Sequence, residues 1–251
     1  MSRYGNYGGF GEYESKAQKL AKSKKKIAAL KKKNPDIEPI LIEGRLLART
    51  WWGKAWNANL EKYSDLSNRL ERGRSYVRNG SILDLQIHAG YITAQIMGSG
   101  SSIYKCRVDI SPLSEKTWQI IKKQSSGSIA SIGELLSGKF PKEMQELFAA
   151  KSDGLFPASS EIKKSCDCPD YASLCKHLAA TLYGIGARFD HKPELIFTLR
   201  GIDSSELVSA VVESHKDDLI SRAKKANKER QLKLKDKQLS KLFDIDFEMP
   251  D

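Results

Sequence analysis

The run CDCPDYASLCKH, from Cys166 to His177, decides how the C-terminal half of this chain folds. It holds a Cys-x-Cys pair and, after a gap of six residues, a Cys-x-His pair. The four candidate metal ligands are Cys166, Cys168, Cys175 and His177. Thiolate sulfur and imidazole nitrogen are the ligands that Zn²⁺ prefers, and three cysteines with one histidine close a tetrahedral, structural shell. The sequence therefore predicts one structural zinc ion.

The spacing of the ligands also predicts their local structure. Cysteines two positions apart point the same way from an extended strand, so the first pair can hold the ion from a strand end. Pro169-Asp170 then turns the chain. Cys175 and His177 would diverge on a continuous helix, so we expect Cys175 to precede a helix that His177 opens. Apolar residues at helical spacing follow, at Leu178, Leu182, Ile185 and Phe189.

A cysteine cluster of this kind has three alternatives to a metal site: a disulfide pair, a redox-active thiol pair, and chance. No secretory segment is visible in the sequence, so we expect a reducing compartment in which structural disulfides are rare. The compact use of standard zinc ligand types favours the metal site.

The residues around this run resemble a known family. The pattern Cys-x-Cys-x6-Cys-x-His followed by LAATLYG resembles the SWIM zinc finger, and further segments resemble the stand-alone bacterial SWIM finger proteins. These segments are RTWWGKAWNANLE (49–61), RLERGRSYVRNGSILDL (69–85), GKFP (138–141), ELIFTLRG (194–201) and LFDIDF (242–247). The resemblance covers about residues 45–201. It implies a zinc-binding, nucleic-acid-binding protein that works beside a Swi/Snf-type helicase.

Composition is consistent with such a partner. Among 251 residues, 42 Lys and Arg outnumber 31 Asp and Glu, which gives a net charge of +11. Net positive charge favours polyanionic partners, with nucleic acid first and anionic membrane second, although a basic protein without such a partner is the plain alternative. No apolar run approaches the ~20 residues that span a bilayer, so a cytoplasmic protein is expected.

The pattern of the chain predicts an α+β fold. An N-terminal antiparallel sheet packed with helices is expected to precede a small zinc-stabilised ββα SWIM finger and C-terminal helices. The expected divisions are a disordered or basic N-terminal arm (1–36), an α+β domain (37–157), the SWIM finger (158–190), a helical extension (191–221), and a basic helix with an acidic-aromatic tail (222–251). The tail and the exposed finger face are candidate protein-docking segments.

Periodicity places the elements of the α+β domain. Thr50 can cap a helix whose one face carries Trp52, Trp56, Leu60 and Tyr63, and this spacing favours core tryptophans over base-stacking ones. Three alternating strands follow and predict an antiparallel meander with one buried face. Their inward residues are Leu83, Leu85 and Ile87; Ile92, Ala94 and Ile96; and Tyr104, Cys106, Val108 and Ile110. Cys106 is expected to be an inert buried thiol rather than a ligand.

Two basic groups compete as nucleic-acid surfaces. The first is Arg69, Arg72, Arg74 and Arg78 around Gly73, where arginine forks suit phosphates and glycine allows close approach. The second is Lys163, Lys164 and Lys176, which flank the cysteines, although they could simply offset the negative charge of a zinc bound by three thiolates. The lysine-rich stretch 15–33 is either a solvated tail or an arm that follows phosphates.

Two functions remain after these observations. Four protein ligands leave zinc no open position, and no phosphate loop or catalytic triad is visible, so we expect no enzyme and no small-molecule substrate. The first hypothesis is an accessory protein that binds nucleic acid, with DNA favoured over RNA. The second is a protein-interaction adaptor for a Swi/Snf-type ATPase, without direct nucleic-acid binding. No membrane association is expected.

Overall fold

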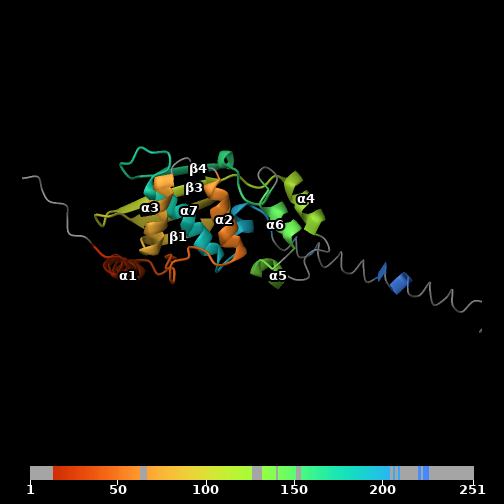
Figure 1. Cartoon of the computed structure of the whole chain (residues 1–251), viewed down its shortest axis with the longest axis horizontal. Helices are drawn as coiled ribbons and strands as arrows, with labels where there is room; N and C mark the ends of the chain where they lie inside the picture. The colour runs from red at the N-terminus through yellow and green to blue at the C-terminus, as the bar shows by residue number, and fades with distance from the viewer. Residues whose placement is uncertain are drawn as a thin grey trace, which may run out of the picture.

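A computed structural model of the chain describes residues 14–62, 67–125, 132–139, 141–150 and 154–203, with positions 206, 209, 220, 221 and 223–225. The helices are α1 (Lys16–Lys33), α2 (Trp51–Glu61), α3 (Ser67–Arg78), α4 (Glu115–Ser125), α5 (Ile132–Ser137), α6 (Lys142–Phe148), α7 (Lys176–Phe189) and α8 (Leu195–Leu199). The strands are β1 (Ile82–His88), β2 (Tyr91–Met97), β3 (Ile103–Ile110) and β4 (Ile162–Cys166), and a 3-10 turn, η1 (Ser159–Glu161), precedes β4. Figure 1 shows their arrangement.

The strands form one antiparallel sheet in the order β1-β2-β3-β4. The predicted meander of three strands is confirmed, and Gly90 takes a positive φ of 79° in the tight turn between β1 and β2. Glycine suits that turn because it has no Cβ to clash in the left-handed region. The α+β class is therefore confirmed.

The zinc-finger region differs from the expected ββα unit in how it meets the sheet. Within the described residues it contributes one strand, β4, which pairs with β3 so that Cys166 lies opposite Cys106. An unpaired sheet edge presents backbone donors and acceptors, and β4 satisfies those of β3. The proposed boundary between residues 157 and 158 stays a prediction, but residues from both sides of it share one apolar core.

Helix α7 lies at the centre of that core, and α2, α3 and β1 pack against it (Figure 1). Small residues let the helices approach closely. A Cβ added to Gly73 of α3 would lie 2.6 Å from the Cβ of Ala179, and one added to Gly53 of α2 would lie 2.5 Å from the carbonyl oxygen of Gly186. The helix that the zinc run predicts is therefore the helix around which the rest of the fold is built.

The tryptophan helix matches its prediction. Thr50 caps α2 by accepting a hydrogen bond from the Gly53 amide, and Trp52 and Trp56 are fully buried. The Trp56 indole donates to the Leu182 carbonyl of α7 at 2.9 Å. These tryptophans are core residues; the fourth predicted position, Tyr63, lies outside the described residues.

Helix α1 is attached to the sheet rather than standing alone. A bulge between Ile82 and Asp84 turns Leu83 away from the main core, so the prediction that Leu83 shares a face with Leu85 is wrong. Leu83 instead joins a second apolar cluster with Ile27 of α1, and with Ile37 and Met97. The Ser23 hydroxyl of α1 also donates to the Asn79 carbonyl at 3.2 Å.

Some predictions fall outside the described residues. Residues 1–13 and most of the range 204–251, including the acidic-aromatic tail, are not described, so the predictions for them stay predictions. Among the helices that are described, none combines the length and the apolar character that a membrane crossing needs.

Candidate metal centre

The four predicted ligands come together from two directions. Cys166 ends β4 and Cys168 follows it in the next loop, while Cys175 and His177 lie at the start of α7. Their ligand atoms all lie within 4.8 Å of one another. A tetrahedral zinc with Zn–S bonds of about 2.3 Å places its sulfurs roughly 3.8 Å apart, so this cluster is close to the size of a zinc shell.

The start of α7 confirms the prediction made from spacing. Cys175 is the N-cap in an extended conformation, and α7 runs from Lys176, so His177 lies in its first turn. The Cys175 sulfur accepts a hydrogen bond from the Leu178 amide at 3.4 Å. The positive end of the helix dipole favours the thiolate form that a metal ligand requires.

His177 is prepared as a neutral ligand. Its side chain is buried, and burial, together with the charge of Lys176, lowers its pKa to about 4, so the imidazole is neutral at pH 7. Its ring stacks on Tyr104 at 4.4 Å and meets Tyr76 edge-on at 5.5 Å. Nδ1 lies 3.9 Å from the Cys166 sulfur, and Nε2 is buried with no hydrogen-bond partner among the described residues. A neutral imidazole held in this way fits a metal ligand.

The thiols need a cation to ionise. Burial raises the pKa values of Cys166 and Cys175 above the ordinary thiol value. A bound divalent ion reverses this preference, because a coordinated thiol loses its proton outright. Soft thiolates with one imidazole are the donor set of structural zinc sites, so the residues present fit zinc.

The loop between the two ligand pairs is held by its aspartates. Asp167 exchanges hydrogen bonds with the Lys105 backbone, accepting at 2.8 Å and donating at 3.2 Å. Asp170 receives both arms of the Arg69 guanidinium, at 2.8 and 3.3 Å. Between the ligand pairs, Tyr171 is fully exposed at 103% of its reference area. The loop therefore presents an aromatic side chain from an anchored position.

Sequence reasoning missed the sulfur beside the cluster. Cys106 of β3 is buried as predicted and lies outside the four-residue group, but its Sγ is 3.5 Å from that of Cys166. Burial raises its pKa to about 11, which keeps it a neutral thiol. The available signal was the alternation of β3, which placed Tyr104 and Cys106 on one face; the pairing of β3 with β4 was not predictable from local pattern.

The four predicted nucleic-acid arginines lie on α3, and three of them have partners within the protein. Arg69 holds Asp170, Arg74 pairs with Glu61 at 2.6 Å, and Arg78 donates to the Arg45 carbonyl at 3.1 Å. Arg72 is exposed and has no ion pair or hydrogen bond with any described residue. The structure brings these arginines onto one helix but uses most of them for internal contacts.

The three predicted lysines do not form one surface. Lys163 and Lys164 are exposed neighbours on β4, and successive side chains of a strand point to opposite faces. Lys176 is half-buried in the first turn of α7. Their role in binding nucleic acid stays a prediction.

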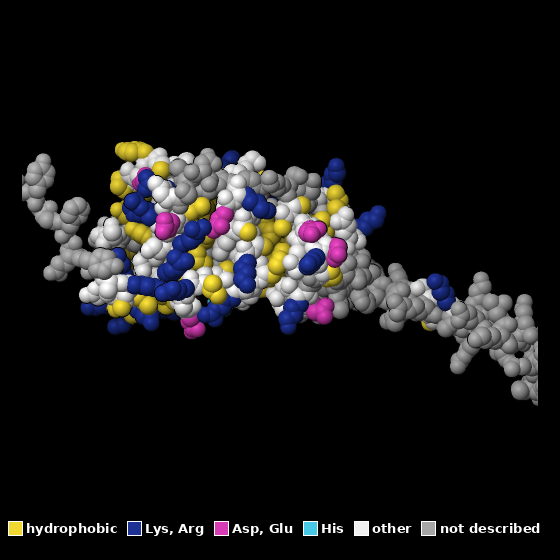
Figure 2. All heavy atoms as spheres, viewed as in Figure 1, with side chains coloured by type: hydrophobic (Ala, Val, Ile, Leu, Met, Phe, Trp, Pro, Cys, Tyr) yellow, Lys and Arg dark blue, Asp and Glu magenta, His cyan; other side chains and the backbone are white. Residues whose placement is uncertain are grey.

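A larger cationic surface lies on α1. This helix contains nine lysines and no acidic residue in its 18 positions. Its buried side chains are Ser23 and Ile27, and seven of the lysines are exposed: Lys16, Lys22, Lys24, Lys25, Lys31, Lys32 and Lys33. Figure 2 shows Lys and Arg side chains gathered over α1 and α3.

Comparisons with known proteins agree with this picture of the centre. A family model described as SWIM zinc finger matches residues 151–184. Over 192 residues the chain is 35% identical to the uncharacterized protein Rv2102 of Mycobacterium tuberculosis, an alignment that covers 73% of this chain and 69% of that protein. No solved structure matches this chain.

Proposed function

This chain belongs to the bacterial SWIM zinc finger proteins, and from that premise we propose that it is a non-catalytic zinc protein that binds nucleic acid through α1. The observation that carries the proposal is the attachment of a helix with nine lysines to the sheet by its one apolar face. A polyanion is the ligand that such a surface attracts, and phosphate contacts dominate the affinity of proteins for nucleic acid.

The lysines of α1 repel one another in the free protein. Lys22 and Lys26 are four positions apart, and Lys19 lies three positions before Lys22. Like charges at these spacings destabilise a helix by about 0.2–0.5 kcal/mol per pair. The capping box of Ser15 with Gln18, and the three lysines of the last turn, which face the negative end of the helix dipole, offset part of this cost. A bound phosphate backbone would remove the rest, so binding is coupled to the stability of α1.

A salt titration with matched charge variants tests this proposal. Fluorescence anisotropy should show log K falling with log salt, by about 0.7 per phosphate neutralised on a single strand and about 0.9 on a duplex. Changing Lys24, Lys25 and Lys32 to Gln together should reduce the slope by about 2 on a single strand. The matched control changes the exposed Lys116, Lys139 and Lys142, at the other end of the molecule, to Gln. Equal losses in both triples would contradict a binding role for α1.

Zinc in this proposal is a single structural ion. Its four ligands come from the protein and leave no open coordination position, so the ion would organise the loop and α7 without activating water. Zinc measured by mass spectrometry should be one per chain. Cys168→Ala should lose the metal and lower the melting temperature by more than about 10 °C, because metal-binding energy is folding energy in such sites.

Cys106→Ala is the matched control for the zinc prediction. This cysteine lies beside the cluster but outside the four-residue group, so its replacement should keep the metal. Wild-type protein that is fully folded without metal, or a Cys106 variant that loses as much zinc as the Cys168 variant, would contradict the assignment.

A protein-interaction adaptor is the second candidate function. The fully exposed Tyr171 favours it, because aromatic side chains on rigid supports are typical centres of protein interfaces. In its wider form the proposal places the protein beside a Swi/Snf-type ATPase, with DNA favoured over RNA. Loss of co-purification of such an ATPase in Tyr171→Ala, with the nucleic-acid affinity unchanged, would assign this loop to the protein partner.

A further inference from the structure

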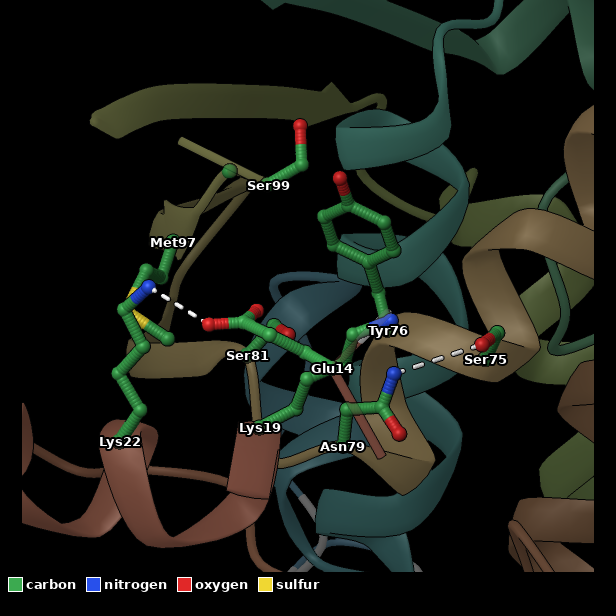
Figure 3. A pocket seen from close by; sticks show the side chains of 10 residues that line it. Glu14, Lys19, Lys22, Ser75, Tyr76, Asn79, Ser81, Met97 and Ser99 are labelled. Atoms are coloured by element: carbon green, nitrogen blue, oxygen red, sulfur yellow. Dashed lines mark hydrogen bonds and ion pairs between the residues drawn. The ribbon is translucent and has the colours of Figure 1, made fainter. Parts of the chain in front are cut away.

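A cavity of about 580 Å³ lies between α1, α3 and the loop after β2 (Figure 3). Ligand pockets of proteins span about 300–1,000 Å³, so this cavity has the size of a binding site. The residues that line it are Glu14, Lys19, Lys22, Ser75, Tyr76, Asn79, Ser81, Met97, Gly98 and Ser99. Segments from three parts of the sequence therefore build one cavity beside the cationic helix.

The two helices contribute different side chains to the cavity: α1 contributes lysines, and α3 contributes neutral polar residues. Lys19 and Lys22 enter from α1, whereas Ser75, Tyr76 and Asn79 come from the last turn of α3 and the residue after it. Figure 3 shows the Tyr76 side chain rising from α3 with its hydroxyl toward Ser99 across the cavity. Ammonium groups suit a phosphate, hydroxyl and amide groups suit sugar and base edges, and a tyrosine ring suits a base.

Among the described residues that line the cavity, Glu14 is the one with an acidic side chain. It pairs with Lys22 at 3.1 Å, and both side chains are about 40% exposed. An exposed pair of this kind contributes little, so an entering phosphate can replace the carboxylate on Lys22. The other polar side chains among the described lining residues belong to lysine, serine, tyrosine and asparagine.

We propose that this cavity receives one unpaired nucleotide of a single-stranded nucleic acid, with its phosphate at Lys19 and Lys22 and its base against Tyr76. The inference rests on the proposed function and adds to it a site and a strand preference. In a duplex each base is paired and stacked inside the helix, so only an unpaired nucleotide can reach a cavity of this kind. The protein should therefore bind single strands more tightly than duplexes of the same sequence.

The same tyrosine connects the cavity to the metal centre. The Tyr76 ring meets the ring of the zinc ligand His177 edge-on at 5.5 Å. The hydroxyl of Tyr76 points toward Ser99 in the loop after β2 (Figure 3). Tyr76 thus lies between the centre and the loop, and its ring contact with His177 would let the metal site set the position of the stacking ring.

A pair of Tyr76 variants tests the stacking contact. The probe is a labelled oligothymidylate of about 12 nucleotides, within the ~4–16 nucleotide range of single-strand sites. Tyr76→Leu should weaken binding by about 5- to 150-fold, which is the usual range for the loss of one stacked base. Tyr76→Phe keeps the ring and should bind within about threefold of wild type. Zinc content and melting temperature of each variant report whether the fold is intact.

A second pair of variants avoids the risk that Tyr76→Leu fails to fold. Ser75 and Asn68 are exposed on α3 two turns apart, so Ser75→Glu and Asn68→Glu change the net charge equally. Only Ser75→Glu places a carboxylate in the cavity, and it should weaken strand binding at least about tenfold more than Asn68→Glu. If both variants weaken strand binding equally, the added negative charge acts through the overall charge of the protein and not through the cavity, and the inference is overturned.

The outcomes separate the cavity from the wider proposal. Wild type that binds neither strand nor duplex refutes the proposed function. If the wild type binds and the variants Tyr76→Leu and Ser75→Glu bind as tightly as the wild type, only the cavity proposal is overturned. Helix α1 then remains the proposed contact. Duplex bound as tightly as the single strand, or thymidine monophosphate competing as well as the strand does, also overturns the inference.

Discussion

Helices α1 and α3 are both strongly basic, yet they use their charge in different ways. Three of the four arginines of α3 are tied to Asp170, Glu61 and the Arg45 carbonyl. Most lysines of α1 face solvent, and the helix contains no acidic residue of its own. A planar guanidinium suits fixed bidentate pairs inside a fold, whereas a strongly hydrated ammonium stays in water. The number of basic residues in a segment therefore does not identify a binding surface; their partners do.

Of the variants that test this difference between α1 and α3, Gly73→Leu should change the free energy of unfolding most. Gly73 lies in the middle of the arginines of α3, and a Cβ there would be 2.6 Å from the Cβ of Ala179 and 2.8 Å from its carbonyl carbon. The α3–α7 contact cannot open without loss of packing, so we expect a loss of about 3 kcal/mol or more in unfolding free energy by chemical denaturation. Ser75→Leu, exposed on the same helix, should change it by less than about 0.5 kcal/mol. Equal stability of the two variants would contradict the close packing of α3 on α7 at Gly73.

Arg69 and Arg72 provide the next test, because we expect only the first to contribute to stability. Arg69→Ala removes the bidentate contact to Asp170 and should cost about 1–2 kcal/mol of stability with little change in nucleic-acid affinity. Arg72→Ala should leave stability within about 0.5 kcal/mol, because the side chain is exposed. Thermal melts and anisotropy titrations check both. If Arg69→Ala instead lowers the nucleic-acid affinity and leaves stability unchanged, the arginines of α3 would contact nucleic acid, as the sequence suggested.

The smallest effect concerns the pH dependence of Glu61. Its burial raises the pKa, but hydrogen bonds from Arg74 and Tyr183, with the charge of Arg74, outweigh burial and lower the pKa below the ordinary 4.5. The folded state therefore stabilises the ionised form of Glu61 relative to the unfolded chain. This contribution to stability is present above about pH 4.5 and is lost as the pH falls through the lower folded value.

Glu61→Gln should remove that pH-dependent contribution. The wild type should then lose stability more steeply than the variant below about pH 4.5, with a difference of under about 1 kcal/mol because the pair is partly exposed. Denaturation at a series of pH values measures it. If the stability of the two proteins changes with pH in parallel, the contact of Glu61 with Arg74 makes no pH-dependent contribution to stability.

Local pattern was sufficient for much of the metal centre and the sheet. The grouping of the four candidate ligands, the N-cap role of Cys175 and the antiparallel meander follow from spacing, because a helix repeats every 3.6 residues and a strand every two. The capping of α2 by Thr50 has the same local origin.

Features that depend on distant segments were not predictable in this way. The pairing of β4 with β3, which brings Cys106 beside Cys166, joins residues that no short pattern links. The bulge at Ile82 and Asp84 turned Leu83 toward α1 and gave the basic helix its place on the sheet. The partners of Arg69 and Arg74 lie on other elements, so their charge looked available when only the sequence was considered.

The position of β4 has a consequence for the behaviour of the protein in concentrated solution. In the described part of the chain β4 is the last strand of the sheet, and no described strand pairs with its outer edge. Lys163 and Lys164 are exposed on this strand. Charged side chains on an edge strand discourage strand-to-strand association. Whatever ligand these lysines meet, we expect them also to discourage the growth of the sheet into aggregates.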